Sequence, residues 1–306
     1  MLPTVSPSAQ IFLADIANVQ SEINTAESQV SSGLKISKPS DSPEQLEALM
    51  RIRADLDRNT QVTSNLSVIK SETDPAEKAL ETATQLMDRA VSLASQGDNT
   101  TQSAATRQAL AQQVTDLLQQ MVGLSQTQVQ GRHVFSGDQA ALASYQLDLA
   151  APNGVDRLIT PTATRQVVDA TGVSFTVAKT AQDIFDHRNP DDSLAPDNVF
   201  ASLNSLVVAL QNNDQAGVTT SIASLHTASD YLNSQLSFYG SVQTRIQDAQ
   251  TYSNDYQVQL QTQLSQVQDA DITQAAIQLS QSNTQLNAAM SAEAQMPRTS
   301  LFSFLA

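Results

Sequence analysis

Hydrophobic residues recur at alternating spacings of four and three near both ends of this 306-residue chain, and this pattern most constrains its fold. The spacing averages 3.5 residues and keeps a narrow stripe on one side of a helix, where a second helix can cover it. A lone helix cannot bury such a stripe, so we predict that the two ends pack against each other, another chain, or both. The stripes are Phe12, Ile16, Val19, Ile23, Ala26 and Val30 near the start, and Ile272, Ala276, Leu279, Asn283, Leu286 and Met290 near the finish.

Asn283 is the one polar member of these stripes. A polar residue at such a position can fix the register and number of the packed helices at some cost in stability. Alternatively, the stripe drifts around the helix and Asn283 lies in water at its edge. The sequence leaves both interpretations open.

The composition favours a helical protein that binds neither nucleic acid nor lipid. Only 4% of the residues are aromatic, which is typical of thin helical bundles rather than thick cores. The 31 acidic residues exceed the 16 basic ones by 15, and this excess argues against nucleic acid and anionic membranes as partners. No run of about 18 apolar residues spans a membrane, and the first residues predict no cleavable signal peptide.

Turn residues divide the N-terminal part into helices. We expect a first helix over residues 8–32, ended by Gly33 in a left-handed conformation. A second helix should run from Pro43 to Gly97, with a kink or a one-residue break at Pro75. A return helix of the same period follows, so this part is expected to form an antiparallel hairpin.

The middle of the chain changes character and the last third is helical again. Alternating apolar and polar residues predict a β-rich unit over residues 136–190, with a tight hairpin turn at Asn153-Gly154. Helix should resume near residues 196–198, followed by a long helix over about 216–251. We expect a separate helix around Tyr256 before the terminal stripe.

The predicted fold class is therefore mainly α with a small β-rich insertion, organised as an elongated antiparallel helical bundle or coiled coil formed by both chain ends. We expect three parts. Residues 1–35 and 262–306 would form terminal coiled-coil assembly helices, residues 36–135 and 191–261 a helical bundle core, and residues 136–190 an exposed β-rich domain.

No residue pattern predicts an enzyme, a cofactor site or a metal site. The histidines His133, His187 and His226 have no partner at catalytic or metal-ligand spacing. The acidic clusters Asp191-Asp192 and Asp269-Ala270-Asp271 are too small for a calcium loop and are expected to be solvated. The absence of cysteine excludes disulfides and thiol chemistry.

Several segments carry more specific patterns. Residues 31–36 (SSGLKI) and 39–43 (PSDSP) place a Ser-Gly turn and a lysine before an Asp-containing loop that opens a helix. Residues 131–137 (GRHVFSG) lie where helix gives way to the β-rich unit. Residues 269–280 open the terminal helix, and residues 301–305 form an apolar tail. These segments resemble the bacterial flagellin family, and residues 131–137 are most similar to its hook–filament junction proteins.

The resemblance implies a structural subunit of the bacterial flagellum, located outside the cell and exported by the flagellar type III system without a cleavable signal peptide. It implies ring or axial assembly with copies of itself, with other hook-associated proteins and with flagellin, and an export chaperone on the C-terminal helix. The assembly interface would comprise Phe12, Ile16, Val19, Ile23, Val30, Ile272, Leu279, Asn283, Leu286 and Met290.

Two alternatives stay open. The lysine-containing segment after Gly33 also suits a filament flagellin. A cytoplasmic helical scaffold that dimerises through its coiled coils is the alternative from another class, and it predicts no β insertion. An enzyme is the most distant possibility.

Overall fold

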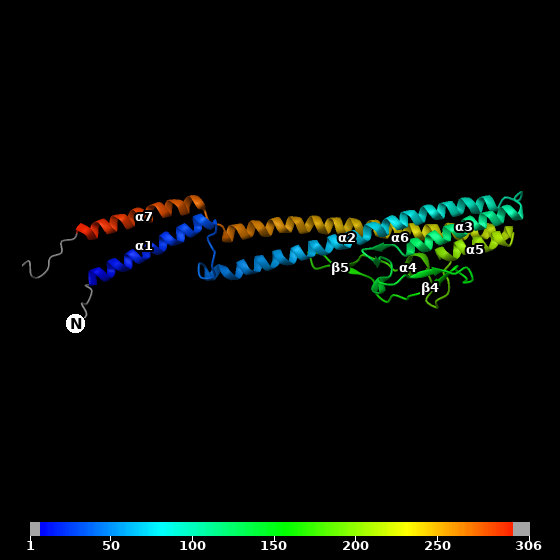
Figure 1. Cartoon of the computed structure of the whole chain (residues 1–306), viewed down its shortest axis with the longest axis horizontal. Helices are drawn as coiled ribbons and strands as arrows, with labels where there is room; N and C mark the ends of the chain where they lie inside the picture. Colours follow the sequence, from blue (N-terminus) through cyan, green and yellow to red (C-terminus); the bar gives the residue numbers. More distant parts are fainter. Residues whose placement is uncertain (1–6, 296–306) are drawn as a thin grey trace, which may run out of the picture. The chain divides into compact units, whose positions relative to one another are not determined.

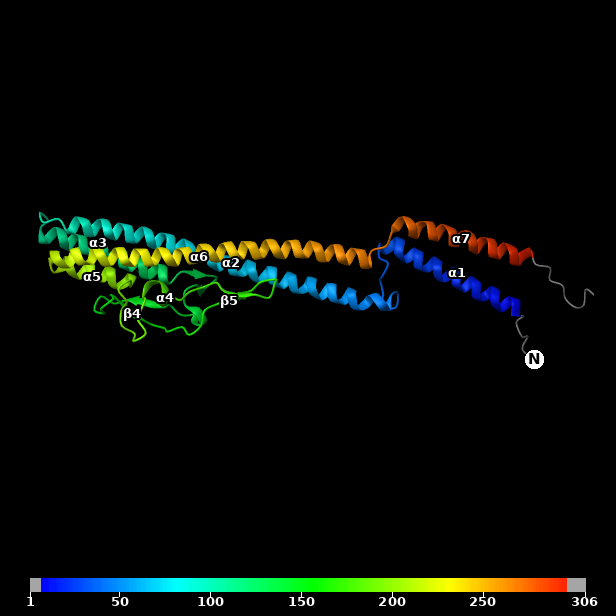
Figure 2. The ribbon, with the colours of Figure 1, turned by 180° about the vertical axis from the view of Figure 1, so that it is seen from behind.

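The computed structural model describes residues 7–295, which fall into two compact units (Figures 1 and 2). The first unit combines the residues up to 58 with those from 256, and the second comprises residues 59–255.

The prediction of a mainly α protein with a small β-rich insertion is confirmed. In chain order the elements are α1 (Pro7–Ser32), α2 (Pro43–Gly97), α3 (Ala104–Ser125), β1 (Gln128–Val129), β2 (Arg132–His133), the 3-10 helix η1 (Gly137–Gln139), β3 (Tyr145–Leu147), β4 (Val155–Arg157), β5 (Gln166–Val168), β6 (Ser174–Thr176), α4 (Ala181–Phe185), α5 (Val199–Gln211), α6 (Gln215–Gln268) and α7 (Ile272–Gln295).

Local signals set most helix ends. After α1, Gly33 adopts a left-handed conformation with φ of 71°, and its amide donates to the Gln29 carbonyl at 2.9 Å. Pro43 is the first residue of α2. Proline suits this position, because the backbone amides of the first turn have no intrahelical acceptor and the missing N–H of proline costs no hydrogen bond there. Ser103 caps α3 by accepting a hydrogen bond from the Thr106 amide at 3.1 Å.

Two expected helix interruptions are absent. Of the kink or one-residue break expected at Pro75, the break is absent, because α2 continues through this residue. An interior proline costs about 3 kcal/mol, but Ala76 and Leu80 are buried beyond it, and this packing holds the helix together. The expected separate helix around Tyr256 is also wrong, since α6 is continuous. There Ser253 is fully buried and its hydroxyl donates to Asn59 Oδ1 at 2.6 Å, which fixes α6 against α2.

The β-rich segment consists of three antiparallel strand pairs rather than one sheet. The loop between β3 and β4 is longer than the predicted tight turn. The Asp148 amide donates to the Gly154 carbonyl at 3.0 Å, and five residues lie between these two positions. Gly154 has φ of 78°, and a Cβ there would lie 2.8 Å from Leu118 Cδ2. A glycine is therefore required by both the backbone and the packing on α3.

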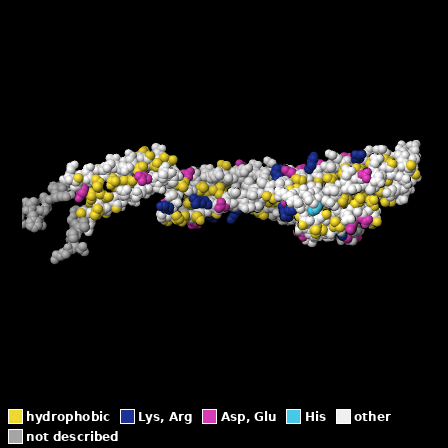
Figure 3. All heavy atoms as spheres, viewed as in Figure 1, with side chains coloured by type: hydrophobic (Ala, Val, Ile, Leu, Met, Phe, Trp, Pro, Cys, Tyr) yellow, Lys and Arg dark blue, Asp and Glu magenta, His cyan; other side chains and the backbone are white. Residues whose placement is uncertain are grey.

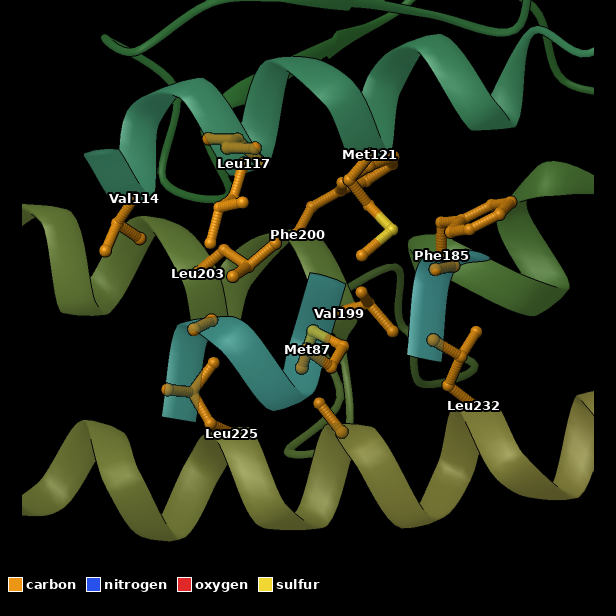
Figure 4. Close-up of a cluster of buried hydrophobic side chains, with 14 of the residues drawn as sticks. Met87, Val114, Leu117, Met121, Phe185, Val199, Phe200, Leu203, Leu225 and Leu232 are labelled. Atoms are coloured by element: carbon orange, nitrogen blue, oxygen red, sulfur yellow. The ribbon is translucent and has the colours of Figure 1, made fainter. Parts of the chain in front are cut away.

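The second unit has a continuous core to which helices and β-rich segment both contribute. Figure 4 shows side chains from α2, α3, α4, α5 and α6 pointing toward one another. Phe185 and Phe200 stack with ring centroids 5.8 Å apart, and both are fully buried. A smaller cluster joins Phe175 of β6 to Leu66 of α2 and Ile246 of α6. The β-rich segment therefore belongs to this core.

A buried carboxylate joins the β-rich segment to α5. Asp186 is fully buried and accepts hydrogen bonds from the Tyr145 hydroxyl at 3.1 Å, from Asn153 and Asn198 at 2.8 Å, and from Arg188 Nε at 2.8 Å. These four donors offset the desolvation of the carboxylate. Burial, with the neighbouring Asp186 charge, raises the pKa of Tyr145 far above its ordinary value, so its hydroxyl stays a donor.

The unit boundaries differ from those expected from the sequence. Contacts divide the chain into two parts rather than three, at points that lie inside α2 and α6. Tyr145, Val155 and Phe185 of the expected β-rich domain are buried in the same core as the helices. The roles expected for the three parts, namely assembly, bundle core and exposed domain, stay predictions.

Truncating a core residue tests this packing. Leu203 of α5 is fully buried, so Leu203→Ala is expected to lower the free energy of unfolding of the second unit by about 2–5 kcal/mol. Urea denaturation followed by near-ultraviolet circular dichroism reports this core, because Tyr145 and Tyr239 lie in it.

The matched control is Val208→Ala on the same helix, where the side chain is 45% exposed. Its effect is expected to stay within about 0.5 kcal/mol. Equal losses for the two variants would contradict the described core.

Candidate assembly surface

Two of the three histidines have structural partners. His133 Nδ1 hydrogen-bonds to the Gln126 carbonyl at 2.9 Å, and His187 pairs with Asp197 at 2.7 Å. His226 is exposed. Within residues 7–295, no group of three or more His, Cys, Asp or Glu side chains could hold a metal ion. In that same range, no helix is both long and apolar enough to traverse a lipid bilayer.

Helices α1 and α7 pack antiparallel within the first unit. We call this pair the terminal hairpin, although its two helices come from opposite ends of the chain. At its closed end Leu34 and Asp269 form a β-bridge, and the Ala270 amide donates to the Gly33 carbonyl at 2.9 Å. The Lys35 amide donates to the Gln268 carbonyl at 2.7 Å. The left-handed Gly33 thus lets the chain leave α1 and pair with the segment that enters α7, so the two ends of the protein start from a fixed register.

The α1 side of the hairpin seam uses the N-terminal stripe. Ile23 and Ala26 are buried at 4% and 2% exposure, and Phe12, Ile16 and Val19 are half-buried. Val30, near the closed end, is 36% exposed. Burial is therefore greatest in the middle of α1 and decreases toward its start.

The α7 side differs from the stripe expected from the sequence. The residues that face α1 are Ala275, Leu279, Ser282, Leu286 and Ala289. At roughly 100° per residue, this seam is turned by about 60° from the expected one, and the two share only Leu279 and Leu286. Ile272 and Met290 are 54% and 57% exposed, and Ala276 and Asn283 are exposed as well.

The polar residue inside the seam is Ser282 rather than Asn283. Ser282 is fully buried, and its hydroxyl donates to Glu22 Oε2 at 3.2 Å. Gln278 Nε2 approaches the same carboxylate oxygen at 3.5 Å. Of the two interpretations of Asn283, the one that places it in water applies to the isolated subunit. The small residues Ala275, Ser282 and Ala289 recur every seven residues and, together with Leu279 and Leu286, have the same four-three spacing as the expected stripe; the sequence analysis missed this signal.

The hairpin leaves apolar surface uncovered. Besides Ile272 and Met290, Ile11, Leu13 and Ile277 are 54–64% exposed. Figure 3 shows hydrophobic side chains reaching the surface along this hairpin. Both terminal helices therefore expose large apolar side chains, on more than one side of each helix.

A groove lies at the open end of the hairpin, on the side of the chain termini. Its volume is about 230 Å³. Its apolar walls are Phe12, Ile16, Val19, Leu286, Ala289 and Ala292.

The hairpin is acidic throughout. Asp15 and Glu293 lie beside the apolar groove, and Glu22 and Glu27 are the other charged residues of α1 and α7. Neither helix contains a lysine or an arginine. The apolar groove therefore lies in a negative electrostatic field.

Sequence comparisons match both ends of the chain. Residues 6–140 match the bacterial flagellin N-terminal helical region, and residues 222–305 match the bacterial flagellin C-terminal helical region. Together these matches include α1, α2, α3 and α7 and most of α6. No curated protein sequence matches the chain.

Structure comparisons find the same fold in flagellar proteins. A flagellar hook-associated protein from Vibrio parahaemolyticus aligns with 75% of this chain and 100% of its own, at 16% identity and a TM-score of 0.64. Hook-associated protein 3 from Legionella pneumophila aligns with 71% of this chain and 98% of its own, at 14% identity and a TM-score of 0.60. FlgL from Xanthomonas campestris covers 71% and 99%, at 17% identity and a TM-score of 0.57.

Two adjacent alanines test the observed seam against the expected stripe. Ala275 is 4% exposed, whereas Ala276 is exposed. Ala275→Glu is expected to lower the free energy of opening of the hairpin by about 3 kcal/mol, because an unpaired carboxylate would enter the seam. Hydrogen exchange of the α1 amides in the isolated subunit measures this free energy.

Ala276→Glu is the matched control, with the same charge one residue away. It should leave exchange in α1 unchanged. The reverse ranking of the two variants would restore the stripe expected from the sequence.

Proposed function

This chain belongs to the bacterial flagellin family, and from this membership we propose that it is the hook–filament junction subunit of a bacterial flagellum. The family resemblance of residues 31–43 and 269–280 is confirmed by the two matching regions. Flagellin-family proteins are structural components of the flagellum and not enzymes. Which part of the flagellum this subunit occupies is the proposal.

The terminal hairpin is the observation that carries the proposal. It joins the two ends of the chain, and it exposes Ile11, Leu13, Ile272, Ile277 and Met290. A subunit that adds to an axial structure through its terminal helices needs such a surface. The solved structures of hook-associated and junction proteins that share the fold favour the junction over the filament.

The partners follow from the same surface. We propose that the hairpin meets copies of this chain around the ring, other hook-associated proteins on one side and flagellin on the other. In the cytoplasm an export chaperone would cover the C-terminal helix, including Leu279, Leu286 and Met290. The chain would then leave the cell through the flagellar type III channel without a cleavable signal peptide, and its lack of cysteine suits passage as an unfolded chain.

Two alternatives are tested with the proposal. A filament flagellin shares the terminal family regions and stays a candidate. The cytoplasmic scaffold is disfavoured, because it predicted no β insertion and the second unit contains three strand pairs.

Immunogold electron microscopy of intact cells, with antibody against residues 136–190, tests the location. The expected result is a single ring of label where the hook meets the filament. Label along the filament would replace the proposal with the flagellin alternative, and label confined to the cytoplasm would replace it with the scaffold.

A second test addresses the exposed face of α7. Ile272→Ser with Met290→Ser should leave the hairpin folded, because both side chains are more than half exposed. If each is buried on assembly, the subunit concentration needed for incorporation should rise on the order of 100-fold. Incorporation into flagella of cells that lack the native subunit is the measurement.

The matched control removes two exposed apolar side chains from the second unit, Leu149→Ser with Val173→Ser. They are 45% and 53% exposed. Incorporation should be unchanged in this control. An equal loss in both double variants would argue against the hairpin as the assembly surface.

A further inference from the structure

Asn153-Gly154, in the loop between β3 and β4, is the only Asn-Gly pair in the chain. Asparagine followed by glycine is prone to spontaneous deamidation, because glycine has no side chain to block attack on the asparagine amide. We propose that this pair is a modification site that is reactive in the unfolded chain and is protected by folding of the second unit. The proposal rests on the geometry of the loop and does not depend on the proposed function.

The reaction needs only the chain itself and water. The Gly154 backbone nitrogen attacks the side-chain carbon Cγ of Asn153, and a succinimide ring forms. The bond from Cγ to the side-chain nitrogen breaks, and ammonia leaves with the proton of the Gly154 amide. Water then opens the ring at either carbonyl, which leaves aspartate or isoaspartate at position 153.

Both reacting groups are held in the folded loop. The Asn153 side chain is 3% exposed, and its Nδ2 donates to the buried Asp186 Oδ1 at 2.8 Å. The Gly154 amide donates to the Ala151 carbonyl at 2.9 Å. The Gly154 nitrogen and the Asn153 Cγ must come within bonding distance to react, so the loop has to lose these hydrogen bonds first. Deamidation of the folded protein is therefore limited by opening of the loop.

Neighbouring helices hold this loop in place. Nδ2 of Asn204 in α5 donates to the carbonyls of Ala151 and Pro152, both at 3.2 Å. A Cβ at position 154 would lie 2.8 Å from Leu118 Cδ2 and 3.0 Å from Asn204 Cγ, so the glycine backbone packs directly on α3 and α5. Both helices contribute to the core of the second unit. Opening of the loop therefore breaks contacts with that core, and the folded protein should open rarely.

The folded structure requires the same two residues that make the unfolded chain reactive. Gly154 has φ of 78°, and Asn153 supplies a donor to a buried carboxylate. An aspartate at position 153 would lose that donor and bring a second negative charge beside Asp186, which is strongly unfavourable in a buried site. Isoaspartate would also lengthen the backbone of a tightly packed loop. A chain that is modified while unfolded should therefore fail to complete the core.

No other position in the sequence offers the same chemistry. Every other asparagine is followed by a residue with a side chain, which slows the attack, and none of the nine glycines follows an aspartate. Folding of the second unit is thus the event that ends the reactivity of the chain. If the subunit leaves the cell unfolded, as proposed above, the time spent unfolded is the period in which this site can be modified.

Peptide mass spectrometry measures deamidation at position 153 in the full-length protein, incubated at mildly alkaline pH with and without guanidinium chloride. The rate in buffer should be lower than the rate in denaturant by on the order of 100-fold, because the loop must open first. Equal rates in the two conditions would overturn the proposal.

The matched control is Thr171→Asn, which makes an exposed Asn-Gly pair with Gly172 in the turn between β5 and β6. In buffer this pair should deamidate at least about tenfold faster than Asn153, because no core contact has to open. In denaturant the two pairs should react at similar rates. Equal protection of both pairs in buffer would contradict a role for the loop between β3 and β4.

Asn204→Ala tests the contacts that hold the loop. It removes two hydrogen bonds to the loop, so it should speed deamidation at position 153 severalfold in buffer and leave the rate in denaturant unchanged. An unchanged rate in buffer would remove Asn204 from the protection.

Asn153→Asp tests the consequence of the modification. It should raise the equilibrium constant for unfolding by on the order of 100-fold, measured by urea denaturation, because the charge enters a buried site. Asn233→Asp, the same change on the exposed face of α6, should leave that constant unchanged. Equal stability of the two variants would overturn the link between modification and folding. No assembly takes place in these experiments, so their failure would leave the junction proposal intact, and a misplaced immunogold label would leave the modification site intact.

Discussion

Antiparallel pairing of helices from opposite ends of the chain is the constraint on which both units depend. In the first unit, Glu22 meets Ser282 across 260 positions of sequence, and in the second, Asn59 meets Ser253 across 194. Neither half of the chain can bury its helical stripes alone. The segment between the paired helices is long in both units. Bringing its ends together costs conformational entropy, and only the completed helix pairing offsets this cost. Each unit therefore forms only once the two distant segments that it pairs are both present, which suits a protein proposed to leave the cell unfolded.

The two units bury their apolar surface to different depths. The second unit has aromatic rings such as Phe185 and Phe200 in a core shared by several elements. In the first unit, the seam between α1 and α7 buries mainly small residues, including Ala26, Ala275 and Ser282. Small side chains bring two helices close but remove little apolar area from water, so they add little stability. The hairpin is thus the part of the molecule with most to gain from contact with further chains.

The sequence predicted those features that depend on local chemistry. Gly33, Pro43 and Gly97 mark helix ends because their backbone preferences act without help from distant residues. The one-residue break, one of the two outcomes expected at Pro75, does not form, because packing on both sides outweighs a local preference. The continuity of α6 was missed for the same reason, because its contact at Ser253 is made with a residue far away in sequence.

The seam of α7 shows a different limit. Two stripes with the same four-three spacing overlap on this helix, and both contain Leu279 and Leu286. Choosing the more hydrophobic one selected Ile272 and Met290, which the structure leaves exposed. Close approach of α1 favours the stripe with smaller residues, and single-sequence hydrophobicity contains no information on that distance. The pattern therefore located the helix and its period but not the face that its partner covers.

The charge of the hairpin links these observations. Glu22 is engaged across the seam by Ser282 and Gln278, while Asp15, Glu27 and Glu293 add further negative charge. The charges of two approaching hairpins repel within roughly the 8 Å Debye length of physiological salt, although their apolar faces attract. The negative charge of α1 and α7 therefore opposes contact between two such surfaces unless a neighbour supplies complementary groups. Charge and apolar exposure together therefore favour contacts in which a cationic surface accompanies the apolar one.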